Sequence, residues 1–155
     1  METIPITRRG YENQKKELDY LKRFERANNI KAVETALAHG DLSENAEYDA
    51  AKERQGFTEA RIRSLEYKLA NADIIDTDKL PKDHAVFGNT VVLENLDTEE
   101  NVTYQLVGPD ESDIDKGRIS VSSPLGKAII GKKPEDEVTI QVPGGKRYYE
   151  IIEIK

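Results

Sequence analysis

Residues that would share one side of a helix recur along the second quarter of the chain at alternating steps of three and four. These positions are Tyr48, Ala51, Gln55, Thr58, Ile62, Leu65, Leu69 and Ala72. The spacing is that of a coiled-coil seam, so it predicts a helix packed against an antiparallel partner. The seam is apolar toward the C-terminal end and polar in the middle, and the sequence Asn71-Ala72-Asp73 predicts where the helix ends.

Residues 8–38 contain no proline and predict the partner helix, with Thr7 as its N-cap. Their apolar positions form two sets: Tyr11, Leu18 and Leu21, then Phe24, Ala27, Ile30, Val33 and Leu37. The sets do not share one heptad frame, so we expect a frame shift and a local bend near Asn28-Asn29. Gly40 is expected to end this helix and Asp41 to open the next, which predicts an αα-hairpin.

After Ile74 the periodicity changes from helical to alternating. Short β-branched runs predict strands at 91–93, 102–107, 119–121, 138–142 and 148–154. One short helix is predicted from Pro124 to Ile130, with Ser123 as N-cap and Gly131 after its end. The predicted fold class is α+β. It comprises a coiled-coil hairpin (1–76), a linker (77–83) and a domain (84–155) with an antiparallel sheet and one helix.

The composition of the chain excludes several kinds of chemistry and of location. The 155 residues include no cysteine, which excludes disulfides and thiolate catalysis and suits a reducing compartment. No apolar run approaches the ~18 residues of a membrane-spanning helix. The N-terminus lacks the charged-then-apolar pattern of a signal peptide, so a cytoplasmic location without membrane contact is expected.

Charge is distributed unevenly along the predicted hairpin. Residues 8–33 hold eight Lys or Arg against four Asp or Glu. Residues 34–49 hold five acidic residues and no Lys or Arg: Glu34, Asp41, Glu44, Glu47 and Asp49. This dipolar pattern would steer an acidic end into a channel while the basic part faces phosphates. Two solvated helices with ordinary interspersed charge are the alternative interpretation.

Asp41 and Glu44 are the candidate chemical groups at the acidic end. Their spacing matches a capping box, in which both carboxylates would only satisfy free N–H groups of the second helix. The same pair could instead bind part of a Mg²⁺ site. Mg²⁺ needs six oxygen ligands, so a partner would have to complete it in trans. His39 is expected to cap the first helix rather than to join the pair. The sequence has no nucleophile or nucleotide-binding motif of its own, so we do not expect an enzyme.

The run from His39 to Tyr48, with Ala50-Ala51-Lys52-Glu53 after it, closely resembles the bacterial transcript cleavage factors of the GreA/GreB family. Ser123-Pro124-Leu125-Gly126-Lys127-Ala128 and Pro143-Gly144-Gly145 resemble the C-terminal half of that family. The resemblance implies that the hairpin enters the secondary channel of RNA polymerase while an FKBP-like domain docks outside. Inside the channel, Asp41 and Glu44 would help hold the polymerase's second Mg²⁺ and orient a water. The polymerase itself would then cut the 3′ end of backtracked RNA.

The resemblance also implies roles for three other residues. Lys52 would face the extruded RNA, whereas Leu37 stands where relatives commonly carry Arg. Ser122 and Pro124 would dock on the polymerase, although capping of the short helix at Ser123-Pro124 explains that segment as well. No Mg²⁺ is expected to bind the free protein stably, and no small-molecule substrate is expected.

Two other functions remain open on the same scaffold. One is an inhibitor that plugs the channel of RNA polymerase. The other is a coiled-coil chaperone or prolyl isomerase, suggested only by the FKBP-like half. The aromatic residues of that half, Phe87, Tyr104, Tyr148 and Tyr149, are predicted to lie in the sheet, so no aromatic-lined isomerase pocket is expected.

Overall fold

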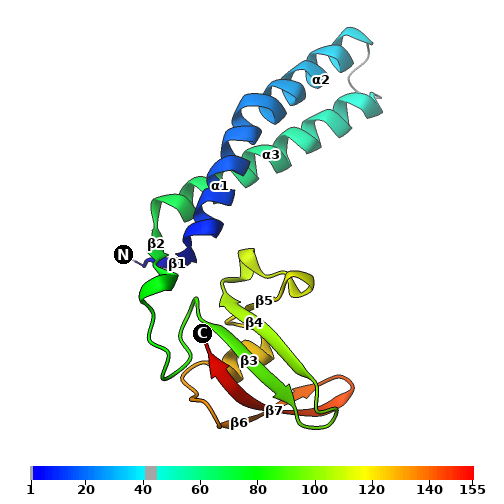
Figure 1. Ribbon diagram of the computed structural model, residues 1–155. Helices are drawn as coiled ribbons and strands as arrows, with labels where there is room; N and C mark the ends of the chain where they lie inside the picture. The colour runs from blue at the N-terminus through cyan, green and yellow to red at the C-terminus, as the bar shows by residue number, and fades with distance from the viewer. Residues whose placement is uncertain (1, 41–44) are drawn as a thin grey trace. The chain divides into compact units, whose positions relative to one another are not determined.

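The computed structural model describes residues 2–40 and 45–155. The chain divides into two compact units, residues 1–4 with 11–72 and residues 5–10 with 73–155. The first unit is helical and the second carries the main sheet, so the α+β class is confirmed (Figure 1).

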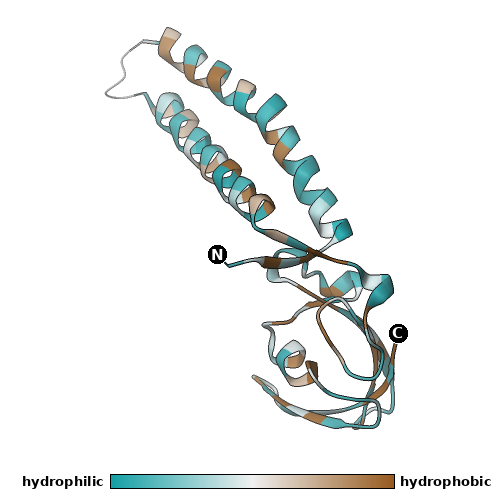
Figure 2. Ribbon diagram, turned by 90° about the vertical axis from the view of Figure 1, so that its left-hand side faces the viewer, coloured by the Kyte–Doolittle hydropathy of each residue, from teal (hydrophilic) through white to brown (hydrophobic). Residues whose placement is uncertain are grey.

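The helical unit is a hairpin. Its first branch comprises α1 (Arg8–Tyr20), a π-helical turn η1 (Leu21–Glu25) and α2 (Arg26–Ala38). The returning branch is the single helix α3 (Ala46–Ala70), which lies beside α2 in Figure 1. Both predicted helices are therefore confirmed. Figure 2 shows hydrophobic residues in short stretches on α2 and α3 with hydrophilic residues between them, as expected for helices that bury only one seam.

The π-helical turn explains the broken heptad frame. A π-turn adds one residue to the helix, which rotates the following residues about the axis. Phe24, Ile30 and Leu37 consequently remain 55%, 45% and 44% exposed, while Asn29 and Ala36 are the buried residues of α2. The expected frame shift is confirmed, but it lies at residues 21–25, before Asn28-Asn29.

The seam predicted for α3 is confirmed. Its buried residues are Ala51, Thr58, Ile62 and Leu65. The polar middle of the seam is one hydrogen bond, in which Asn29 Nδ2 donates to Thr58 Oγ1 over 2.8 Å. A buried Asn at one seam position typically fixes the register of a coiled coil.

Arg26 and Glu59 form a bidentate pair beside the Asn29–Thr58 hydrogen bond. The two N···O distances are 3.0 and 2.9 Å. Hydrogen bonds from the Arg26 guanidinium hold the pKa of Glu59 below its ordinary value. The side chains are 39% and 34% exposed, so solvent screens the pair and its contribution to stability is modest.

The second unit contains a five-stranded sheet in the order β5-β4-β3-β7-β6. The strands are β3 (Thr90–Asn95), β4 (Asn101–Val107), β5 (Arg118–Ser120), β6 (Glu137–Val142) and β7 (Gly145–Ile154). The prediction of an antiparallel sheet is wrong for one pair, because β4 and β5 run parallel. The segment joining them carries two 3₁₀ turns, η4 (Pro109–Glu111) and η5 (Ile114–Lys116), instead of a tight hairpin turn.

The short helix α4 (Pro124–Ile129) closes the core of the second unit. Ser123 is its N-cap, because Ser123 Oγ accepts from the Gly126 N–H over 3.1 Å. A Cβ at Gly126 would lie 2.0 Å from the Ser120 carbonyl oxygen, so glycine permits the close approach of α4 to β5. One cluster of core side chains, each at most 5% exposed, comprises Ala85, Val91, Leu93, Leu106, Ile119, Ile129, Ile151 and Ile154.

A second, two-stranded sheet pairs β1 (Ile4–Thr7) with β2 (Ala72–Ile75), and a 3₁₀ turn η3 (Thr77–Lys79) follows. The sequence predicted an extended start of the chain but not this pairing. Thr7 is the expected N-cap of α1, since the Gly10 N–H donates to Thr7 Oγ1 over 3.0 Å.

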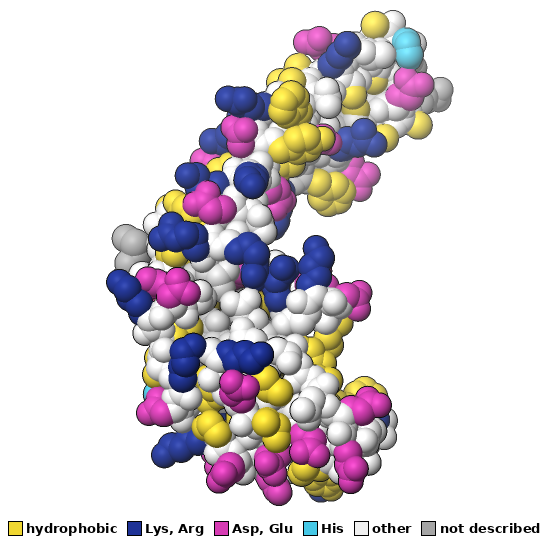
Figure 3. Space-filling view, viewed as in Figure 1, with side chains coloured by type: hydrophobic (Ala, Val, Ile, Leu, Met, Phe, Trp, Pro, Cys, Tyr) yellow, Lys and Arg dark blue, Asp and Glu magenta, His cyan; other side chains and the backbone are white. Residues whose placement is uncertain are grey.

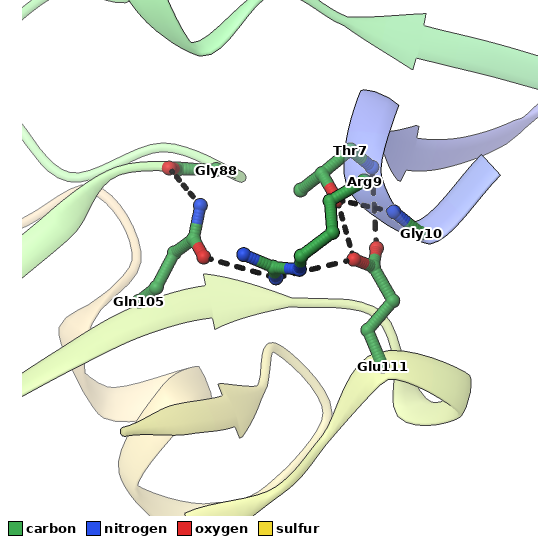
Figure 4. Close-up of polar contacts among 6 residues, drawn as sticks. All are labelled: Thr7, Arg9, Gly10, Gly88, Gln105 and Glu111. Carbon is green, nitrogen blue, oxygen red and sulfur yellow. Dashed lines mark hydrogen bonds and ion pairs between the residues drawn. The ribbon is translucent and has the colours of Figure 1, made fainter. Parts of the chain in front are cut away.

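Glu111 of η4 holds the start of α1 in place (Figure 4). Its carboxylate accepts hydrogen bonds from the Thr7 N–H over 3.1 Å and from the Thr7 hydroxyl, and it lies 3.6 Å from Arg9 Nη2. A Cβ at Gly10 would come within 2.3 Å of the Glu111 carboxyl carbon. Glycine at position 10 therefore makes room for this carboxylate.

Candidate functional site

The end of the hairpin carries the acidic residues singled out by the sequence, but Asp41 and Glu44 lie outside the described residues. The helix that follows them begins at Ala46. Its N-cap is Asn45, whose Oδ1 accepts from the Tyr48 N–H over 3.0 Å. The second helix was expected to open at Asp41, whereas α3 begins five residues later; the capping box itself was predicted for Asp41 and Glu44 and lies outside the described residues. Asn is as good an N-cap as Asp, and the sequence offered both within five positions.

Asn45 also joins the two branches of the hairpin. Its Nδ2 donates to the Ala36 carbonyl oxygen at the end of α2 over 2.7 Å. One side-chain amide thus satisfies a free N–H at the start of α3 and adds a second donor to the Ala36 carbonyl oxygen, which also accepts from the His39 N–H over 3.2 Å. Because Asn45 supplies the cap, the start of α3 does not require the carboxylates of Asp41 and Glu44.

A second contact across the end of the hairpin joins His39 and Glu47. His39 Nδ1 lies 2.8 Å from Glu47 Oε2, and the two side chains are 58% and 67% exposed. The expectation that His39 caps the first helix is confirmed, because its backbone N–H donates to the carbonyl oxygens of Ala36 and Leu37, while its side chain binds Glu47. In the part of the chain that the structure describes, no cluster of three or more His, Cys, Asp or Glu is arranged to hold a metal ion.

The predicted RNA-facing residue Lys52 is exposed on α3. Its Nζ donates to Gln55 Oε1 over 3.1 Å, one turn further along the helix. Figure 3 shows other Lys and Arg side chains distributed along the hairpin, next to a group of hydrophobic side chains. The basic side chains that the sequence predicted for this part of the chain are therefore exposed on the hairpin.

The predicted docking residues Ser122 and Pro124 are exposed in the second unit. Ser122 Oγ lies 2.7 Å from Ser120 Oγ, and Pro124 is the first residue of α4. Capping of α4 at Ser123-Pro124 is thus confirmed, and it leaves the surfaces of Ser122 and Pro124 available.

An apolar hollow of about 480 Å³ opens near this segment. Its lining comprises Pro5, Val86, Phe87, Val121, Lys127 and Ile130. Phe87 lies in a turn before β3 rather than in the sheet, so its predicted strand position is wrong. Tyr104, Tyr148 and Tyr149 lie in strands as predicted.

No helix in the described residues is long and apolar enough to cross a membrane. Two family models match consecutive parts of the chain. Residues 4–74 match the transcription elongation factor N-terminal domain, and residues 80–155 match the C-terminal domain of the GreA/GreB transcription elongation factors. The chain belongs to the GreA/GreB family of transcription elongation factors.

Curated relatives bear the name transcription elongation factor GreA. The protein from Neisseria meningitidis serogroup A is 54% identical over 156 residues, and the one from Pasteurella multocida is 53% identical over 156 residues. Each alignment covers 100% of this chain and 99% of the relative. Among solved structures, GreA factor homolog 1 of Thermus thermophilus is 28% identical over 99% of both chains, with a TM-score of 0.46.

Proposed function

We propose that this elongation factor binds RNA polymerase and stimulates cleavage of backtracked RNA by the polymerase itself. The hairpin would enter the secondary channel. Asp41 and Glu44 would then add ligands to the second Mg²⁺ of the polymerase and orient the attacking water. A Mg²⁺ ion whose ligands come partly from each protein would take part in two-metal phosphoryl-transfer chemistry. The chain would act as a cofactor of cleavage, not as an enzyme.

The observation that carries this proposal is the Asn45 cap. Asn45 is the N-cap of α3, a role that the alternative explanation gave to Asp41. Its second hydrogen bond, to Ala36, fixes the chain on the C-terminal side of these carboxylates against the end of α2. Holding ligand groups in advance where a weakly bound ion must sit is an efficient way to lower a reaction barrier.

Docking would use the surface of the second unit around Ser122 and Pro124. Both residues are exposed, and the apolar hollow beside them is open to solvent. Lys52 would face the extruded RNA from the hairpin. The partners in this proposal are RNA polymerase and the 3′ end of the transcript, and the Mg²⁺ belongs to the polymerase.

The test is the double variant Asp41→Asn with Glu44→Gln, assayed on a stalled, backtracked polymerase complex. We expect the variant to bind polymerase normally and to lose stimulated cleavage, because both side chains lose the negative charge that Mg²⁺ requires. The matched control is Glu34→Gln with Asp49→Asn, which removes two negative charges from the same region and should cleave normally. Normal cleavage by the first variant would refute the proposal.

The inhibitor alternative predicts a different result in the same assay. A channel-plugging protein would slow RNA synthesis without promoting cleavage, whether or not the two carboxylates are present. Isomerase activity is tested separately, by turnover of a proline-containing peptide.

A further inference from the structure

The hairpin exposes several aromatic side chains. Those that are more than half exposed are Tyr20, Phe24, Phe57 and Tyr67. The rings of Tyr20 and Phe24 contact each other, with centroids 5.6 Å apart, and Figure 3 shows hydrophobic side chains gathered on one face of the hairpin. Exposed apolar patches commonly mark interaction sites, so this surface is a candidate interface.

A groove between α2 and α3 lies on the same side of the hairpin as Phe24 and Phe57. It has a volume of about 520 Å³, and its lining includes Asn28, Ala32, Ala50, Ala51 and Arg54. Phe24 precedes Asn28 by four residues, and Phe57 follows Arg54 by three. Residues three or four apart share one side of a helix. Both rings therefore flank a groove whose apolar lining is made of small alanine side chains.

The two ends of the hairpin differ in charge. Residues 34–49, at its end, hold five acidic residues and no Lys or Arg, whereas residues 11–23 and 58–72 together hold seven Lys or Arg against five Asp or Glu. Lys16 is exposed and precedes Tyr20 by four residues, so it lies on the side of the aromatic patch. This side thus runs from a basic end, through aromatic rings and a groove, to an acidic end.

That order of features is complementary to itself. Phe24 lies four residues before Asn28 and Ala32 lies four residues after it, each about 6 Å away along the helix axis. A two-fold axis beside Asn28 would therefore place Phe24 of each copy at Ala32 of the other. The same axis would place Lys16 of each copy opposite position 40 of the other, at its acidic end. An interface between identical copies requires this kind of self-complementarity.

We propose that two copies of the chain associate through this side of their hairpins, running antiparallel, with Phe24 of each filling the alanine-lined groove of the other. Lys31 and Arg54 also line the groove. Within residues 2–40 and 45–155, neither forms an ion pair. Cations attract the face of an aromatic ring, so both would stabilise an inserted Phe24.

Association would cover one side of both hairpins, including the acidic end that the proposed function sends into RNA polymerase. The dimer would then be a storage form that cannot stimulate cleavage. This consequence rests on the proposed function, whereas the association itself does not.

Analytical ultracentrifugation of the full chain in about 50 mM salt tests the association. We expect the average mass to rise from 17.5 kDa toward twice that value between about 1 and 500 µM protein. Phe24→Gln with Phe57→Gln should weaken the association at least about tenfold, as the loss of buried aromatic anchors does. Both rings are largely exposed in the single copy, so the variant should fold normally.

The matched control is Tyr67→Gln with Ile114→Gln, which removes two apolar side chains that are 61% and 65% exposed elsewhere. Tyr67 follows the seam residue Thr58 by nine residues and so points about 180° away from the seam. This control should associate like the wild type. A wild type that stays monomeric at every concentration, or equal losses in the two variants, would overturn the proposal.

Filling the groove separates a fitted interface from nonspecific apolar association. Ala50 is exposed, so Ala50→Phe is tolerated in the single copy. It adds apolar surface, yet it should weaken the association because the groove can no longer admit Phe24. Stronger association of this variant would refute the fit. Raising the salt from about 50 to about 500 mM should also weaken the dimer by screening Lys16 from the acidic end, and a salt-independent mass would contradict the antiparallel arrangement.

The register is tested with single cysteines, because the chain has none of its own. A residue on a two-fold axis meets its own counterpart, so Asn28→Cys should form a disulfide-linked dimer under mild oxidation. Tyr67→Cys, on the side away from the seam, should cross-link far less. Equal cross-linking at the two positions would show that the copies do not meet at Asn28.

The consequence for polymerase is tested with the same cysteine. The oxidised Asn28→Cys dimer should not stimulate cleavage, and reduction should restore stimulation. Equal stimulation by the oxidised and reduced forms would refute the storage role. Association is measured without polymerase, so normal cleavage by Asp41→Asn with Glu44→Gln would refute the proposed function and leave the dimer standing.

Discussion

Replacing Asn45 with alanine should loosen the end of the hairpin by a measurable amount. The change removes the N-cap bond to the Tyr48 N–H and the bond to the Ala36 carbonyl. Loss of an Asn N-cap costs about 1 kcal/mol, and loss of a neutral hydrogen bond costs about 1 kcal/mol more. The local free energy of opening should therefore fall by about 2 kcal/mol.

Native-state amide hydrogen exchange is the suitable assay, because it reports local opening rather than global unfolding. A loss of about 2 kcal/mol corresponds to about 30-fold faster exchange in the first turn of α3. The sheet of the second unit should exchange at its wild-type rate. Stimulated RNA cleavage should fall in the same variant, while binding to polymerase through the second unit should persist.

The control Asn45→Asp separates the two hydrogen bonds of Asn45. A carboxylate still accepts from the Tyr48 N–H but cannot donate to the Ala36 carbonyl. The first turn of α3 should stay protected in this variant while the last turn of α2 opens. Wild-type exchange rates for Asn45→Ala would refute the role of Asn45 in closing the hairpin.

Two further predictions concern the start of α1 and the middle of the hairpin. Gly10→Ala should destabilise the chain by about 1–3 kcal/mol in denaturant unfolding, because its Cβ would displace Glu111 from Thr7. Combining it with Glu111→Ala should cost less than the sum of the two changes, and strict additivity would contradict this contact. Glu59 has its pKa lowered by Arg26, so its contribution to stability is present above the unfolded-state pKa and is lost as pH falls through the lower folded value. Glu59→Gln should therefore reduce the acid sensitivity of thermal unfolding below about pH 4.5, and an unchanged pH profile would count against the pair.

The sequence alone predicted the elements whose signals are local. The seam of α3 follows from a periodicity within one segment, and the positions it predicted are buried or half-buried, including the polar Thr58. The five strands of the main sheet and the Ser123 cap of α4 also depend on neighbours a few positions away. The local pattern also singled out Asp41 and Glu44, and the resemblance to a known family implied their role in RNA cleavage, which stays a prediction.

The tertiary structure decided the features that depend on contacts between distant residues. The π-turn at Leu21–Glu25 shifts the frame of the first branch, so that Asn29 is buried in the seam and Phe24 is exposed. Packing against α3 determines which face of this branch is buried. No local sequence pattern predicts the parallel pairing of β4 with β5 or the hydrogen bonds between Thr7 and Glu111, because each joins segments that lie apart in the sequence.

The double role of Asn45 has the same origin. A polar N-cap would satisfy the start of α3 by itself, and only the packing of α3 beside the end of α2 brings the Ala36 carbonyl within reach as a second partner. Periodicity along a chain determines which residues share a face, whereas the register between helices determines which faces meet.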